Sequence, residues 1–227
     1  MHALSSLAPW ANAIILGVVA LVLSPLLGKL ADALPAQVDD SQVWPATQGT
    51  RARQLLFGLL CALPAAACGW RFGLGAAGLA ATAFMLMLAT LAWVDAYTGL
   101  LPDALTLSLL WLGLLVNLGN IFTPLPHAVI GAAAGYLFFW IIFQAFLLFT
   151  GREGLGYGDF KLLAALGAWL GWTALPNIVL IASVSALVVT RLRRWVSGAD
   201  MNHALHYGPY LALAGAVQLF LGFFWAV

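Results

Sequence analysis

The sequence predicts an all-α membrane protein, a polytopic transmembrane helical bundle of about eight spans with its amino terminus outside. Hydrophobic residues make up 63% of the 227 residues, and only 7% of them are charged. The mean hydropathy is +1.00, whereas roughly a quarter of a soluble globular domain is charged. These values exclude a soluble domain, and the net charge of +1 excludes a basic nucleic-acid-binding surface.

Apolar runs recur along the chain at lengths that suit a bilayer, since a span needs about 17–25 apolar residues. The first run follows an amino terminus with no basic region, which predicts a retained helix and not a cleaved signal peptide. The sixth and seventh runs meet around Gly171 to Pro176, so they form either two helices or one bent, partly re-entrant element. The eight expected helices are 9–27, 54–70, 74–94, 104–123, 127–150, 161–174, 176–190 and 208–226.

One sizeable polar segment, residues 28–53, separates the first two expected helices. It is too short for a domain, so it is predicted to be a loop within a single integral-membrane domain over residues 1–227. Eight spans with an outside amino terminus place this loop in the cytoplasm. The same topology leaves only Arg71 outside among the nine Lys and Arg residues, which is the expected positive-inside bias.

Two isolated carboxylates, Asp95 and Asp159, stand at the ends of apolar runs. A carboxylate in or beside a bilayer is costly and therefore indicates a functional site. Gly156 and Gly158 precede Asp159, and we expect these glycines to allow close backbone approach and unusual dihedral angles. The predicted topology brings both acids to the cytoplasmic boundary, where they can meet.

Two carboxylates that share a site do not both ionise at low cost, so one keeps its proton near neutral pH. The ionised partner can take a proton from water, and the neutral partner can donate a hydrogen bond to a peptide carbonyl. This is aspartyl peptide hydrolysis, which requires no metal and no nucleotide cofactor. From charge alone, two alternatives stay open: boundary acids that cap helices, and a proton- or cation-coupled transporter that uses the same pair.

Three ordered blocks carry a resemblance to a known family. The run Asp95-Ala-Tyr-Thr-Gly-Leu-Leu-Pro-Asp103, continuing to Asn117, resembles the first aspartate block of type IV prepilin leader peptidases. Glu153-Gly-Leu-Gly-Tyr-Gly-Asp159-Phe-Lys161, continuing to Gly171, resembles the second block, and Tyr207-Gly-Pro-Tyr the carboxy-terminal one. The Gly-x-Gly-Asp core alone is weak, because other intramembrane aspartyl proteases share it. The resemblance covers about residues 74–220.

The resemblance implies a multi-pass aspartyl endopeptidase of the bacterial inner membrane, with Asp95 and Asp159 as its catalytic pair. Its implied partners are membrane lipid and prepilins of type IV pili or pseudopilins of type II secretion. Members of the family remove a short basic leader on the cytoplasmic side, before the apolar helix of the pilin. The transporter stays the first alternative, and a protease that acts on unrelated membrane proteins is the second.

The chain departs from the longer members of that family at one point. Those members also methylate the new amino terminus and carry two Cys-x-x-Cys pairs, whose spacing suits zinc, after the first helix. Residues 28–53 contain no cysteine, and Cys61 and Cys68 belong to the next expected helix. The sequence therefore predicts a short form with no metal and with peptidase but not methyltransferase activity.

Three further residues are candidates for substrate binding. Asp103 follows a proline at an expected helix start, where an acidic side chain caps free N–H groups. We interpret Asp103 first as a helix cap and second as a substrate-binding residue. Glu153 is either a contact for the basic leader or a solvated loop acid. Lys161 either tunes the acidity of Asp159 or is a membrane-edge lysine that follows the positive-inside bias.

Overall fold

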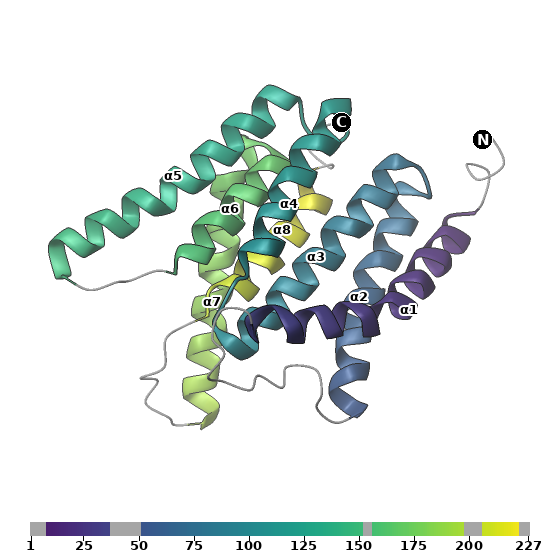
Figure 1. The fold of residues 1–227 in the computed structure, drawn as a ribbon, viewed down its shortest axis with the longest axis horizontal. Coiled ribbons are helices and arrows are strands. Elements are labelled where there is room, and N and C mark those ends of the chain that lie inside the picture. The colour runs from purple at the N-terminus through teal and green to yellow at the C-terminus, as the bar shows by residue number, and fades with distance from the viewer. Residues whose placement is uncertain (1–7, 37–50, 152–155, 198–205, 223–227) are drawn as a thin grey trace. The chain divides into compact units, whose positions relative to one another are not determined.

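The computed structural model describes residues 8–36, 51–151, 156–197 and 206–222, and most of these residues are helical (Figure 1). Eight α-helices are found within these ranges, one for each predicted helix, and no strand occurs there, so the all-α fold class is confirmed. The elements are α1 (Pro9–Ala36), α2 (Arg51–Phe72), α3 (Ala76–Thr98), α4 (Asp103–Val116), η1 (Asn117–Gly119), α5 (Leu125–Thr150), α6 (Tyr157–Leu170), η2 (Trp172–Ala174), α7 (Leu175–Ser197) and α8 (Gly208–Gly222).

Five of these helices, α1, α2, α3, α5 and α7, are long and apolar enough to cross a membrane. The protein is therefore a multi-pass membrane protein. Helices α4 and α6 have 14 residues each, and α8 has 15. At 1.5 Å per residue they measure roughly 21–23 Å, less than the ~30 Å hydrocarbon core. That all eight helices span the membrane, with the amino terminus outside, stays a prediction.

The chain forms two compact units, Met1–Leu105 and Thr106–Val227. The first contains α1, α2 and α3, and the second contains most of α4 together with α5, α6, α7 and α8. Whether residues 1–227 act as the single membrane domain that the sequence predicts stays a prediction.

The polar segment predicted as a loop is shorter than expected at both ends. Helix α1 continues to Ala36 and α2 begins at Arg51, so Lys29 and Asp32 lie on a helix. The reason is local, because Lys, Leu and Ala favour a helix and a charge does not end one. Residues 37–50 lie outside the described part of the chain.

In the first unit, α1 packs against α2 and α3, and α2 packs against α3. Helix α1 contains Pro25, which has no N–H to donate to the carbonyl of Leu21. The Ser24 hydroxyl donates to that carbonyl instead, at 2.8 Å. A side-chain hydrogen bond thus replaces the missing backbone bond, and α1 continues past the proline with a bend that Figure 1 shows along its length.

In the second unit, α6 is the central helix, with ten of its fourteen residues buried. Helix α5 lies against it so closely that a Cβ on Gly131 would overlap the carbonyl of Gly167, and the reverse also holds. Small residues permit this approach, as is common between membrane helices. On another side, α8 packs against α6 with Gly215 over Leu166. The burial of α6 fixes the position of the acid in its first turn.

The junction after α6 resolves the alternative left open by the sequence. Helix α6 ends at Leu170, a 3-10 turn follows, and α7 begins at Leu175. Gly171 has a φ of +81°, a backbone conformation that only glycine adopts without strain. The two apolar runs are therefore two separate helices and not one bent element.

Candidate active site

Asp95 lies in the last turn of α3 and is only 4% exposed. The helix ends four residues later at Gly99, whose φ of 67° and N–H bond to the Asp95 carbonyl at 2.8 Å form a left-handed cap. The Thr98 hydroxyl donates to the Val94 carbonyl and accepts the N–H of Leu100. Asp95 is thus held in a helix end whose backbone groups are paired.

Aromatic rings fix the same turn of α3 against α2. The Trp93 ring lies 5.2 Å from that of Phe57 and 5.0 Å from that of Tyr97, measured between centroids. The Arg53 guanidinium lies 5.2 Å from the Tyr97 ring centroid, within the range of a cation–π contact. These contacts pack the end of α3, which carries Asp95, against α2.

Asp159 lies in the first turn of α6 and is 7% exposed. Its N–H donates to the Gly156 carbonyl at 3.1 Å, and its carboxylate turns back toward the helix start. A helix amino terminus carries free N–H groups and a partial positive charge, so it stabilises a carboxylate placed there.

The two motif glycines do not adopt unusual dihedral angles, so that expectation is wrong. Gly156 is extended, with φ −77° and ψ 140°, and Gly158 lies within α6. A Cβ on Gly156 would lie 3.6 Å from Asp159 Oδ2, an ordinary van der Waals distance. What the motif supplies at Gly156 is a small residue beside the carboxylate.

Asp95 belongs to the first compact unit and Asp159 to the second. Each acid lies at a helix end, as the sequence predicts, and the structure adds that each is buried. That the two carboxylates meet as a pair stays a prediction.

The other predicted site residues have different outcomes. Asp103 opens α4 and is exposed, a placement that suits a helix-start acid. Lys161 lies two residues after Asp159 on α6, and side chains at that spacing do not face each other, which weakens the proposed tuning. Glu153 lies outside the described residues. Within the described ranges, no three His, Cys, Asp or Glu side chains gather as metal ligands would.

The structure adds two residues near Asp159 that sequence reasoning missed as site residues, Tyr207 before α8 and Ser183 on α7. Their hydroxyl oxygens lie 3.0 Å apart, and the Tyr207 ring meets that of Phe139 edge-on at 6.0 Å. The pKa of the Tyr207 phenol is raised, chiefly by burial and to a lesser degree by the negative charge of Asp159. The hydrogen bond with Ser183 acts in the opposite direction and lowers this pKa. The phenol therefore stays protonated at neutral pH, and either hydroxyl of the pair can donate in their hydrogen bond.

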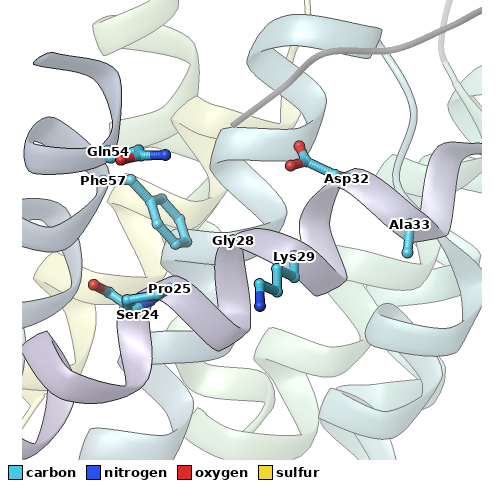
Figure 2. Close-up of a pocket in the computed structure, with 8 residues that line it drawn as sticks. All are labelled: Ser24, Pro25, Gly28, Lys29, Asp32, Ala33, Gln54 and Phe57. Atoms are coloured by element: carbon cyan, nitrogen blue, oxygen red, sulfur yellow. The ribbon is translucent and has the colours of Figure 1, made fainter. Parts of the chain in front are cut away.

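A separate cavity of about 480 Å³ lies between α1 and α2 in the first unit. Figure 2 shows the Phe57 ring reaching from α2 toward Gly28 of α1, and Lys29 and Asp32 pointing to different sides of α1. These opposite charges give the cavity no net preference for an acidic or a basic ligand. None of the predicted site residues lines it.

Comparison with known proteins gives a consistent set of relatives. Residues 82–191, which include both acids, match the type IV leader peptidase family. The chain is 55% identical over 152 residues to a prepilin leader peptidase/N-methyltransferase of Dickeya chrysanthemi, a match to 67% of this chain and 53% of that protein. The protein of the same name from Pseudomonas putida is 47% identical over 163 residues, 71% of this chain and 56% of that protein. No solved structure matches.

The chain spans about half the length of these curated relatives. The family match ends at residue 191, so Tyr207 lies beyond it. Ser183, its hydrogen-bond partner, lies within the match.

Proposed function

Because the chain belongs to the type IV leader peptidase family through residues 82–191, we propose that it is an aspartyl endopeptidase of the bacterial inner membrane. It removes the short basic leader of type IV prepilins or type II secretion pseudopilins on the cytoplasmic side. The observation that carries this proposal is the presence of two acids, each more than nine-tenths buried, inside the family match. Asp95 and Asp159 form the catalytic pair.

In the proposed mechanism, one acid is ionised and the other keeps its proton, as expected of coupled carboxylates. The placement of Asp159 at the start of α6 favours it as the ionised member. Asp159 takes a proton from water while the oxygen of that water bonds to the carbonyl carbon of the leader peptide. Asp95 donates its proton toward the carbonyl oxygen and stabilises the tetrahedral intermediate.

Collapse of that intermediate breaks the peptide C–N bond and releases the leader with a new carboxylic acid group, which then loses its proton to solvent. The proton held by Asp159 passes to the departing amine, and Asp95 recovers its own proton from the hydroxyl of the intermediate. The two acids return to their starting states, so the cycle consumes one water and no other reactant.

The proposal is limited to cleavage. The relatives are named as methyltransferases as well, but residues 28–53 contain no cysteine to form the zinc pairs of the longer members. We therefore do not propose that this chain transfers a methyl group to the new amino terminus.

The purified full chain, reconstituted in lipid vesicles, tests the proposal on two substrates. One is a prepilin with its basic leader, and the other is a transmembrane peptide of the same length with an unrelated sequence. We expect mass spectrometry to show a single cut after the leader of the prepilin and no cut in the second peptide. Equal cleavage of both would replace the proposal with a general intramembrane protease, and no cleavage of either would overturn it.

Tyr207→Phe removes the phenolic hydroxyl near Asp159 and keeps the ring that meets Phe139. We expect kcat to fall roughly 100- to 1,000-fold, the range in which one positioned donor contributes, with KM unchanged. Tyr210→Phe is the control, since this half-buried tyrosine also lies near the start of α8. Equal kcat values for the two variants would remove Tyr207 from the site.

A further inference from the structure

An apolar groove of about 530 Å³ lies in the second unit, between α5 and α7 with α6 as its floor. One end is lined by Ile130, Trp172 and Leu175, and the other by Phe138, Leu163 and Ser183. Four of the lining side chains are large and apolar yet 46–62% exposed: Ile130, Phe138, Trp172 and Leu180. On membrane-crossing helices such a surface contacts either lipid tails or an apolar segment of another protein.

The direction of the groove follows from the antiparallel packing of its helices. Gly131 of α5 meets Gly167 of α6, and Gly135 meets Leu163 one turn nearer to the start of α6. Phe143 of α5 then meets Tyr157, at 5.0 Å between ring centroids. The walls from Ile130 to Phe138 and from Leu175 to Ser183 therefore run toward the start of α6. Each covers eight residue steps, or about 12 Å of helix.

The near end of the groove leads to Asp159. Leu163 follows Asp159 by four residues on α6, so the two side chains lie on the same helix face, about 6 Å apart along the axis. Ser183, at this same end, is hydrogen-bonded to Tyr207 at 3.0 Å. The polar end of an otherwise apolar groove thus lies one helical turn from the proposed catalytic acid.

These features match an apolar α-helix that enters the site from the bilayer. A groove about 12 Å long accommodates two turns of helix. The remaining 6 Å to Asp159 is the length of about two extended residues. We propose, building on the proposed function, that the groove holds the first two turns of the apolar helix that follows the cleaved bond in the substrate. The groove thereby positions the scissile bond at Asp159.

Filling the groove tests this proposal. Ala134, a half-buried groove residue of α5, is changed to tryptophan. We expect KM for a prepilin that keeps its apolar helix to rise tenfold or more, as expected when apolar contacts to a substrate are lost. Cleavage of a shortened prepilin, cut off before its apolar helix, stays as in the unchanged enzyme. Leu187→Trp, at an exposed α7 position outside the groove, is the control and leaves both rates unchanged.

Two outcomes of this comparison are informative in different ways. If the unchanged enzyme cuts the prepilin but Ala134→Trp and Leu187→Trp have equal KM values, the groove proposal is overturned and the peptidase proposal stands. If the unchanged enzyme cuts neither prepilin, the proposed function itself fails, and the groove proposal fails with it.

Photo-crosslinking identifies the occupant directly, even where Ala134→Trp fails to fold. A benzoylphenylalanine replaces Leu180, a groove residue that is 62% exposed, or Leu187 as the control, which is 57% exposed. In vesicles with bound prepilin, we expect the probe at position 180 to attach to the apolar helix within its first eight residues. Attachment to lipid or to a second copy of the chain at both positions, with no prepilin adduct, would overturn the proposal.

Discussion

Asp95→Asn and Asp159→Asn are each expected to abolish leader removal while the protein still inserts and accumulates. Asparagine keeps the size of the side chain, but it can neither take a proton from water nor donate one as an acid. General acid–base catalysis contributes about 10²–10⁴-fold per group, so a loss of roughly 10³-fold is expected from either change. Because the two groups act as one unit, the double variant should lose little more than either single variant.

The same variants are expected to be at least as stable as the unchanged protein. In the proposed mechanism Asp159 is buried and ionised, and a buried charge opposes folding more than a neutral amide of similar shape. Asp95 keeps its proton, so its change to asparagine replaces one neutral buried group with another of similar shape. A catalytic loss combined with an equal or higher unfolding temperature therefore separates a chemical role from a structural one.

Mass spectrometry of the prepilin amino terminus, with thermal unfolding in detergent, measures both effects. Asp32→Asn makes the same chemical change at a half-buried acid of α1 and is expected to cut at the unchanged rate. Leader removal that persists in either Asp95→Asn or Asp159→Asn would contradict the proposed pair.

The fold class and the number of helices could be predicted because each helix is an apolar run of membrane-spanning or nearly spanning length. The boundaries were harder to predict, and the α1 end shows why. Lys29 and Asp32 ended the apolar run, yet they continue the helix to Ala36, since hydropathy marks where apolar surface stops and not where backbone hydrogen bonds stop. The motif glycines show a similar limit, because Gly156 and Gly158 have ordinary dihedral angles.

The two acids were found from sequence because an isolated charge in an apolar chain is costly whatever the fold. Ser183 was not, since a serine in an apolar helix has no such signal and its role depends on α7 and Tyr207 packing together. The groove could not be predicted from the sequence either, because its walls come from α5, α6 and α7 and form only when these helices pack together. The meeting of Asp95 with Asp159 rests on the predicted topology and on chemistry.

Asn117→Leu is expected to destabilise the second unit severely, because Asn117 is fully buried and its side-chain amide makes four hydrogen bonds. Its Nδ2 donates to the carbonyls of Ala168 and Trp169 at 2.8 and 3.0 Å, in the last turn of α6. Its Oδ1 accepts the N–H groups of Phe122 and Thr123 at 3.1 and 3.2 Å. One side chain therefore pairs backbone groups that helix ends otherwise leave unsatisfied.

Leucine fills a similar volume but leaves the buried N–H of Thr123 and the part-buried N–H of Phe122 without this acceptor, and a buried group left in this way costs about 1–3 kcal/mol. Asn177→Leu makes the same change at an exposed position of α7 and is expected to leave stability within about 0.5 kcal/mol. Thermal unfolding followed by tryptophan fluorescence should show a large drop for the first variant alone. Leader cleavage measured well below the lowered transition should remain near normal, because Asn117 holds the end of α6 opposite to Asp159 and takes no part in the reaction. A stable Asn117→Leu protein would mean that neighbouring groups replace all four bonds, and the α6 end would then not depend on this residue.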